Sequence, residues 1–307
     1  MALPVKTISI AVLLICCGCG SPRQRSAPPI DPALLMLAPS DSTSLLWIKM
    51  EKLVKTPGFD YLAKSGMIHD LLDLVAAQTS FDPRKDFWEM LFVSNGRDIL
   101  MLARGQFAAM GMEPEFKKQG SQRTAYRGQT FITTGGAVLT FMSPSSIAVG
   151  GREALQRLVD ERAERRGGPP PALMARAEQI DRKNQVWWAL SAPASLLPRQ
   201  IPSASGGFSN ILANLPRLLN GVRMITGSLD LSGGINAAAT ADFEDGSQAR
   251  QSADALGAFL ALARATVPKA RTPQPGLYDS VKIDRNDSAV RILIDAPMSV
   301  LIQSFVL

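Results

Sequence analysis

The sequence predicts an α+β fold with two similar copies of an antiparallel sheet and helices packed on one face. Two stretches of the 307-residue chain share one order of elements: strand, helix, hairpin, helix, hairpin, helix. Hairpins followed by helices favour antiparallel sheets with helices on one face. A content of 46% hydrophobic and 20% charged residues is ordinary for a folded globular protein. Whether the two sheets join edge to edge or form separate lobes stays open.

The first copy opens with an apolar run at Thr43–Met50, which predicts a strand. Apolar residues at helical spacing then predict a helix over Phe59–Gln78. Asp82-Pro83 combines an N-cap residue with proline at the first helical position, and so predicts a short helix that runs to Trp88.

A hairpin follows, because two apolar runs flank Asn95-Gly96, a pair typical of the type I′ turn. Its strands are Met90–Ser94 and Asp98–Arg104. The rest of the copy is predicted as a helix at Phe107–Gln119, strands at Ala125–Thr133, Ala137–Met142 and Ser146–Val149, and a helix at Arg152–Arg165.

The second copy repeats this order. It is predicted as a strand at Gln185–Ala192, a helix at Phe208–Leu219, strands at Arg223–Leu231 and Ile235–Phe243, a helix at Ser247–Ala265, a hairpin of Tyr278–Asp284 and Ala289–Asp295, and a helix near Met298–Val306. Between the copies, Gly167-Gly168-Pro169-Pro170-Pro171 breaks any helix, and Ala172–Arg182 is a short connecting helix. The predicted division is a signal peptide at 1–18, a tether at 19–42, the first copy at 43–166, a linker at 167–183 and the second copy at 184–307.

The amino-terminal segment has the layout of a secretory signal. Met1–Lys6 carries one positive charge, and Thr7–Ile15 is an apolar run that ends in Cys-Cys-Gly-Cys-Gly. This run is about half of the ~20 residues that a transmembrane helix needs, so a permanent span is disfavoured.

Gly18-Cys19-Gly20-Ser21 resembles the lipobox of bacterial lipoprotein signals, in which an aliphatic residue and small residues precede an invariant cysteine. Cys16 and Cys17 depart from that pattern, since they stand where an aliphatic and a small residue are usual. Two alternatives remain: cleavage before Cys17, with Leu14 in the aliphatic position, and a plain signal peptide with incidental cysteines.

The resemblance implies a cut before Cys19, diacylglycerol on its sulfur and an acyl chain on its amino group. Two or three chains at ~0.8 kcal/mol per buried CH₂ anchor a protein stably. Because Gly20 rather than an aspartate follows the cysteine, the resemblance implies the periplasmic side of the outer membrane, if the cell has one. Ser21–Pro32 is proline-rich and lacks periodicity, as expected of an extended tether.

The positions of the cysteines and the net charge argue against several kinds of site. All three cysteines lie at positions 16–19, so the body has no disulfide framework and no thiolate metal site. The formal charge of +6 falls to +5 when Lys6 leaves with the signal peptide, too mild an excess to indicate nucleic acid. We expect the membrane as a partner through Cys19, a protein partner in the envelope as an open possibility, and no nucleic acid.

Catalytic groups are sparse. The single histidine, His69, lies beside Asp70 and four residues before Asp73, a spacing that fits a surface i,i+4 pair better than an oriented base. With one histidine, a zinc site would need carboxylates almost throughout. No Gly-x-Ser-x-Gly and no Walker A loop occurs. We therefore expect no catalytic residue, no metal, no cofactor and no enzymatic activity.

Weaker candidates have ordinary structural explanations. Gly135-Gly136 and Gly150-Gly151 are more typical of tight turns than of anion sites. Trp187-Trp188 point to opposite faces of their strand, and Trp47 occupies the corresponding strand of the first copy. The acidic residues Asp242, Glu244, Asp245, Asp279, Asp284 and Asp287 fit caps and turns, and the methionines Met90, Met101, Met110, Met112 and Met142 fit core filling or an adaptable apolar pocket.

As a whole, the body resembles bacterial lipoproteins with a duplicated α+β body, which share the lipobox, the proline-rich tether and a Tyr-x-Gly strand like Tyr126-Arg127-Gly128. The favoured hypothesis is a lipid-anchored cell-envelope protein without catalytic activity that acts as a binding or structural module. The alternative is a carrier of an apolar ligand in a cavity of the α+β body. A third hypothesis, an enzyme, needs carboxylates that converge only in space. The ligand-binding residues are not readable from the sequence.

Overall fold

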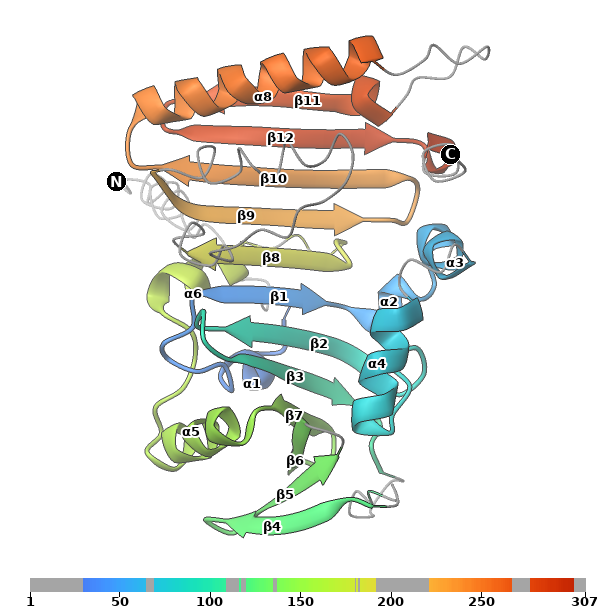
Figure 1. Ribbon diagram of the computed structural model, residues 1–307, viewed down its shortest axis with the longest axis vertical. Helices are drawn as coiled ribbons and strands as arrows, with labels where there is room; N and C mark the ends of the chain where they lie inside the picture. The colour runs from blue at the N-terminus through green and yellow to red at the C-terminus, as the bar shows by residue number, and fades with distance from the viewer. Residues whose placement is uncertain are drawn as a thin grey trace, which may run out of the picture.

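The protein is built on one antiparallel sheet of twelve strands, in the order β11-β12-β10-β9-β8-β1-β2-β3-β7-β6-β5-β4 (Figure 1). The computed structural model describes residues 30–64, 69–108, 116, 120–134, 137–179, 181, 183–191, 221–266 and 277–300. In Figure 1 the helix α8 runs along one end of the sheet, and the hairpin β4–β5 forms the other end. The predicted α+β class with antiparallel pairing is confirmed.

The strands are β1 Ser44–Ile48, β2 Phe87–Ser94, β3 Ile99–Gly105, β4 Gln122–Tyr126, β5 Gln129–Thr134, β6 Ala137–Ser143, β7 Ser146–Gly150, β8 Val186–Ser191, β9 Val222–Asp230, β10 Ile235–Phe243, β11 Val281–Asn286 and β12 Ala289–Ala296. The helices are α1 Pro32–Leu35, α2 Met50–Leu53, α3 Pro57–Lys64, α4 His69–Thr79, α5 Arg152–Ala163, α6 Pro171–Ala177 and α8 Gly246–Thr266, with a 3₁₀ turn η2 at Leu277–Ser280.

The two copies join edge to edge, which answers the question that the sequence left open. Strands β1 and β8 are antiparallel neighbours, with Trp47 opposite Trp187. Outward from this junction the order β1-β2-β3-β7-β6 is matched by β8-β9-β10-β12-β11, and the first half adds β5 and β4. An axis normal to the sheet at the junction therefore relates the two halves by a local two-fold rotation.

Short helices before β1 and β8 repeat this relation. α1 begins Pro-Ala-Leu-Leu at Pro32, and α6 begins Pro-Ala-Leu-Met at Pro171. Leu34 of α1 and Leu173 of α6 are both almost fully buried in the same apolar cluster. This short match and the paired tryptophans are signs of duplication that element order alone did not bring out.

Helices pack on both faces of the sheet, so the prediction of helices on one face is wrong. Along β2, Leu91 packs with α1, α5 and α6, whereas its neighbour Met90 packs on the other side with α2, α3 and α4. Successive strand residues point to opposite faces. We call these the α6 face and the α8 face, because α8 covers Ile225 and Ala241 on the second side.

Two predicted elements are wrong, and the local residues explain why. At Asp82 there is one turn and no helix: the backbone N–H groups of Lys85 and Asp86 donate to Asp82 O, and β2 begins at Phe87. The predicted strand Ala125–Thr133 is two strands, because Arg127 and Gly128 have φ of 46° and 79° and form a two-residue turn.

The hairpin predicted at Asn95-Gly96 is confirmed, but its turn differs from the prediction. Ser94 pairs with Ile99, so four residues form the loop. Gly96 has φ of 85°, while Asn95 keeps a negative φ and accepts from the N–H groups of Arg97 and Asp98 at 3.1 and 2.9 Å. Asn95 thus acts through its side chain and not through the backbone of a type I′ turn.

The helix predicted over Phe59–Gln78 corresponds to α3 and α4. The predicted strands β1, β6, β7, β8, β9, β10 and β12 and the helices α5 and α8 are confirmed, each end within two or three residues of the prediction. The helix predicted at Ala172–Arg182 is α6 and ends at Ala177, five residues early. The strand predicted at Tyr278–Asp284 is β11, and its first residues belong to the 3₁₀ turn η2. The predicted helix Phe208–Leu219 lies outside the described residues, as do most of Phe107–Gln119 and of Met298–Val306.

The tether predicted at 19–42 is too long at its carboxyl end. Ile30, Leu34, Leu35 and Ala38 are all buried in the apolar cluster on the α6 face. Asp31 caps α1 by accepting from Ala33 N at 2.8 Å. From Ile30 onward the chain is therefore part of the folded body, and the absence of sequence periodicity concealed a short capped helix.

Candidate functional site

The one site residue named from the sequence, Cys19, lies outside the described residues. Within the described part of the chain, no helix is long and apolar enough to cross a membrane.

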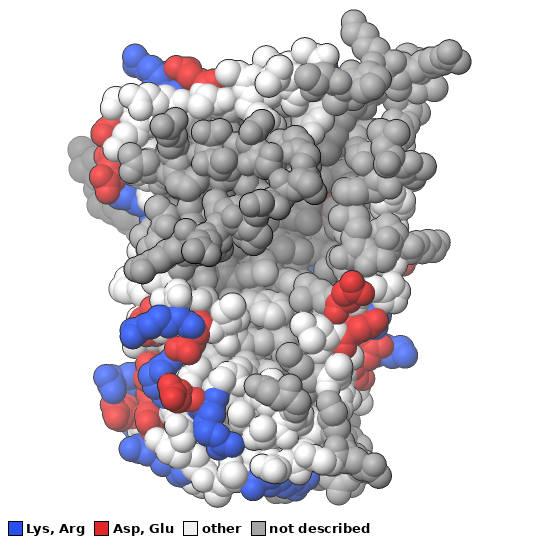
Figure 2. All heavy atoms as spheres, viewed as in Figure 1, with Lys and Arg blue, Asp and Glu red and all other residues white. Residues whose placement is uncertain are grey.

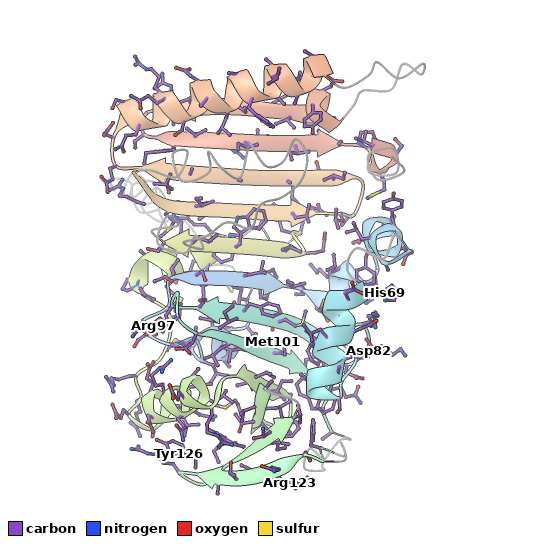
Figure 3. The ribbon with its side chains drawn as sticks, viewed as in Figure 1. His69, Asp82, Arg97, Met101, Arg123 and Tyr126 are labelled. Carbon is purple, nitrogen blue, oxygen red and sulfur yellow. The ribbon has the colours of Figure 1, made fainter. Side chains whose placement is uncertain are left out.

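His69 belongs to an exposed ion-pair cluster on α4 (Figure 3). Its Nδ1 lies 3.7 Å from Asp73 Oδ2 and 3.1 Å from Arg84 Nη2, and both His69 and Asp73 are more than half exposed. The hydrogen bond from Arg84 holds the pKa of Asp73 below its ordinary value, and the same bond raises the pKa of Arg84. The surface i,i+4 pair expected from the sequence is confirmed.

Three of the acidic residues singled out in the second half have a structural role: Asp242, Asp245 and Asp287. Asp245 Oδ1 accepts from Gln248 N at 3.0 Å at the start of α8. Asp242 pairs with Arg176 at 2.5 Å. Asp287 has φ of 46° in the turn between β11 and β12. Among the residues that the structure describes, no three His, Cys, Asp or Glu side chains are grouped so that they could hold a metal ion.

Gly150-Gly151 has a packing role. Gly150 lies opposite Leu100 in the sheet, where a Cβ would come within 2.5 Å of Leu100 Cδ2. Gly151 is the N-cap of α5. The tight-turn interpretation is the better one here, whereas Gly135-Gly136 lies outside the described residues.

The described methionines do not share one pocket. Met90 and Met101 are buried on the α8 face, and Met142 is buried on the α6 face. They fill the core, as the sequence favoured; Met110 and Met112 lie outside the described residues.

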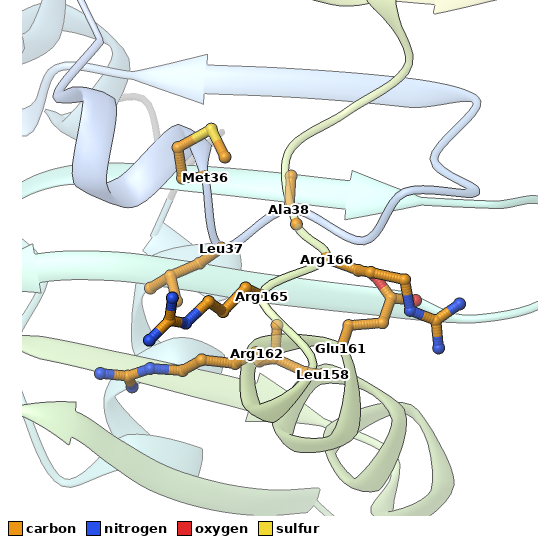
Figure 4. Close-up of a pocket in the computed structure, with 9 residues that line it drawn as sticks. Met36, Leu37, Ala38, Leu158, Glu161, Arg162, Arg165 and Arg166 are labelled. Carbon is orange, nitrogen blue, oxygen red and sulfur yellow. The ribbon is translucent and has the colours of Figure 1, made fainter.

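A small pocket of about 140 Å³ lies between the segment after α1 and the end of α5 (Figure 4). Its apolar lining includes Leu37 and Leu158, and Arg162 and Arg165 lie on one side of it with Arg166 across from them. Ligand pockets usually measure about 300–1,000 Å³, so this hollow is too small for a drug-sized molecule. Elsewhere on the first half, acidic and basic side chains intermingle at the surface (Figure 2), as in the Arg127–Asp160 pair at 3.0 Å.

A larger groove of about 400 Å³ lies on the α6 face of the second half. Its floor crosses four neighbouring strands, β8, β9, β10 and β12, through Trp187, Ser228, Thr226, Thr240 and Arg291. The register places Trp187 opposite Ser228, Thr226 opposite Thr240 and Thr240 opposite Arg291. We call this feature the sheet groove.

The wall of the sheet groove is formed by described residues between the last turn of α6 and β8: Arg176, Gln179, Asp181 and Asn184. Arg176 at the end of α6 bonds Asp242 of β10, which fixes this segment over the sheet. Gln179 and Asn184 follow and face the groove. Asn184 as a whole is only 8% exposed.

The sheet groove is lined by polar groups that lack protein partners. No described residue hydrogen-bonds the side chains of Asn184, Thr226, Ser228 or Thr240, or the indole N–H of Trp187, and all of these groups are accessible from the groove. Buried polar groups in proteins nearly always have a partner. Asn184 is 8% exposed as a residue, and its amide atoms are accessible from the groove, where a ligand or ordered water can complete their hydrogen bonds.

At the equivalent place in the first half, the protein fills the space itself. Leu91 lies opposite Trp47 as Ser228 lies opposite Trp187. Leu91 thus corresponds to Ser228, and Glu89, two residues before Leu91, corresponds to Thr226, two residues before Ser228. Glu89 Oε2 accepts from Trp47 Nε1 at 2.8 Å.

Across the strand pair, the counterpart of Thr240 is Arg104, since Glu89 pairs with Arg104 as Thr226 pairs with Thr240. Arg104 contacts Asp31 and lies 3.3 Å from Glu89 Oε1. A carboxylate from strand β2 and another from the chain before α1 thus occupy the first half's version of the groove.

Sequence reasoning missed the sheet groove. Thr226, Ser228 and Thr240 alternate with apolar residues, which for a strand alone indicates a solvated face. The paired tryptophans were a usable signal. When Trp47 is aligned with Trp187, Glu89 aligns with Thr226, so the second half lacks the carboxylate that accepts from the tryptophan in the first half. Strand register decides that these residues meet, and a single sequence does not give register across a long connection.

No protein-family model and no curated protein matches this chain. Its fold is similar to that of TP0453: crystal form I has a TM-score of 0.51 at 12% identity and covers 90% of this chain and 98% of that chain. Crystal form III of TP0453 has a TM-score of 0.48 at 12% identity over 91% and 99% of the two chains. Crystal form IV has a TM-score of 0.46 at 13% identity over 90% and 96%. At such identity the likeness concerns the fold alone.

Proposed function

We propose that this protein is a lipid-anchored binding module of the bacterial cell envelope, which holds a polar ligand or partner and catalyses no reaction. The sheet groove carries this proposal. Its Asn184 amide and its row of strand hydroxyls line the groove and have no hydrogen-bond partner among the described residues. Recognition requires no more than such groups in fixed positions.

The location comes from the amino-terminal pattern. A short apolar run followed by Gly18-Cys19-Gly20 supports cleavage before Cys19 and acylation of that cysteine. Two or three acyl chains then hold the body at the membrane surface. We place the protein on the periplasmic side of the outer membrane where the cell has one, with the membrane as its first partner and an envelope protein as a second.

The alternative, a carrier of an apolar ligand, has less support. Of the two hollows described above, the apolar one measures about 140 Å³ and the larger one is lined by polar side chains. Carriers of apolar ligands need a mainly apolar cavity of several hundred Å³. A lipid that copurifies with an unanchored Cys19→Ser variant would favour the carrier over the polar binding module.

Cell fractionation of cysteine variants tests the anchor. We expect the wild-type protein in the membrane fraction and the Cys19→Ser variant either released or retained with its signal peptide. Cys17→Ser is the matched control, because it alters a neighbouring cysteine and should leave anchoring unchanged. If Cys17→Ser releases the protein while Cys19→Ser does not, the anchor is at Cys17. If Cys19→Ser stays in the membrane fraction and still loses its signal peptide as the wild type does, and Cys17→Ser also changes nothing, the lipoprotein proposal is wrong.

A further inference from the structure

We propose that the sheet groove binds a sugar acid, with ring hydroxyls on Asn184 and the strand hydroxyls and a carboxylate on Arg291. This inference rests on the proposed function, since it names the ligand class that the anchored module holds. It starts from the contrast between the filled site of the first half and the open site of the second.

The two tryptophans show what the second half lacks. Trp47 donates its indole N–H to Glu89 at 2.8 Å. Trp187 occupies the same place in the second half and is 5% exposed, and Thr226 stands at the position that corresponds to Glu89. A ligand oxygen in the sheet groove would accept from Trp187 as Glu89 accepts from Trp47. The indole N–H of Trp187 has no protein acceptor among the described residues and is accessible from the groove, so an oxygen of an occupant can accept from it.

The other lining groups match a polyhydroxylated molecule. Hydroxyls of Thr226, Ser228 and Thr240 both donate and accept, and the Asn184 amide does the same through two atoms. Sugar hydroxyls have this double capacity as well. The groove spans three inter-strand steps of about 4.8 Å, or roughly 14 Å, which accommodates one or two pyranose rings.

Among polyhydroxylated ligands, the positive charge of Arg291 favours one that carries a carboxylate. Arg176 is paired with Asp242, and Asp181 with Lys183 at 3.6 Å. Arg291 is exposed on β12, opposite Asp284 of β11, and no ion pair within 4.0 Å joins it to a described residue. A guanidinium binds a carboxylate through two parallel hydrogen bonds, so Arg291 gives the groove one position for an acid.

Nuclear magnetic resonance of the indole N–H groups tests this directly, with D-glucuronic acid as the probe. The chain has four tryptophans and so four indole signals. We expect the acid to shift the Trp187 signal, assigned with Trp187→Phe, and to leave the Trp47 signal in place. Methyl α-D-glucopyranoside, which lacks the carboxylate, should bind at least tenfold more weakly.

Two variants separate the groove from the rest of the surface. Arg291→Gln should weaken glucuronic acid at least tenfold, whereas Arg285→Gln, an exposed arginine of the neighbouring strand β11, should bind as the wild type does. Thr226→Glu restores the acceptor of the first half, so it should fill the site, abolish binding and keep the protein folded.

The inference is overturned if about 10 mM acid, which nearly saturates a site with a Kd of about 1 mM, does not shift the Trp187 signal. It is also overturned if the neutral glycoside binds as tightly as the acid. Unchanged binding of the acid by Arg291→Gln or by Thr226→Glu would overturn it as well. The proposed function fails separately. An unmodified Cys19 with glucuronic acid bound in the groove would leave the ligand inference standing, and a lipidated protein that ignores the acid would leave the anchored module standing.

Discussion

At the scale of single residues, a buried polar cluster stabilises the first half. Glu89 is 7% exposed and joins the indole of Trp47 to the guanidinium of Arg104, which also contacts Asp31. Each charge has a hydrogen-bonded counterpart, the condition under which buried charges are tolerated. Removal of one member leaves the others desolvated and unpaired.

We therefore expect Glu89→Ala to lower the free energy of unfolding by about 3 kcal/mol, the typical loss when one partner of a buried pair is removed. Glu89→Gln, which keeps an acceptor for Trp47, should lose less. Denaturant unfolding at pH 7 measures both, with the exposed Glu153→Ala as the control. A loss no larger than that of the control would show that the cluster is not a stabilising unit.

Asp245 gives a pH-dependent contribution at the start of α8. Hydrogen bonds from the Ser247 hydroxyl and the Gln248 N–H hold the pKa of Asp245 below its ordinary value. A carboxyl with a lowered folded-state pKa stabilises the protein above its unfolded pKa of about 3.9, and that contribution is lost as the pH falls through the folded-state pKa.

The difference in stability between wild type and Asp245→Ala should accordingly be larger at pH 7 than at pH 3. Thermal unfolding at both pH values measures it, and Asp254→Ala, an exposed carboxyl in the middle of α8, is the matched control. An equal difference at the two pH values would contradict the assignment of Asp245 as an ionised cap.

At the scale of elements, a glycine and a tryptophan connect β8 to β9. Gly227 lies opposite Trp188 on the α8 face, and a Cβ at Gly227 would meet Trp188 Cζ2 at 2.0 Å. The ring thus lies over the glycine, as in sheets where an aromatic side chain covers a backbone that a glycine leaves bare.

Gly227→Ala should therefore destabilise the protein by about 1–3 kcal/mol, the usual cost of overpacking. Gly233→Ala, where a Cβ meets nothing within 4 Å, should change stability by less than about 0.5 kcal/mol. Removing the ring tests the mechanism: in a Trp188→Ala background, Gly227→Ala should be nearly neutral. A full penalty in that background would exclude the ring contact as its cause.

Most elements were readable from local patterns, because apolar periodicity and turn residues act over a few neighbouring positions. The β2–β3 hairpin followed from two apolar runs around Asn95-Gly96 even though the loop proved longer. Errors arose where signals competed: Asp82-Pro83 favours a helix start, but Phe87 begins a strand that the sheet requires. The sheet groove was out of reach, since Asn184, Thr240 and Arg291 meet only through strand register.

At the scale of the whole molecule, one sheet and one apolar cluster join the halves. The cluster on the α6 face includes Trp47 from the first half and Trp187 from the second, together with Leu34 of α1. The chain from Ile30 onward is consequently part of the body that the lipid would hold at the membrane.

Leu34→Ala should lower the free energy of unfolding by about 3 kcal/mol, as expected for a leucine that is 1% exposed. Met36→Ala, two residues later and 50% exposed, should change it by less than about 1 kcal/mol. Calorimetry of the two variants compares them directly. Equal, small effects would mean that α1 belongs to the tether after all.

The central claim, a lipid-anchored binding module, is tested most directly by native mass spectrometry of the protein extracted from membranes. We expect an amino terminus at Cys19 that carries diacylglycerol and an acyl chain, and a polar small molecule or an envelope protein retained by the body. An unmodified Cys19, or residues 1–18 still attached to the membrane-bound protein, would contradict the account.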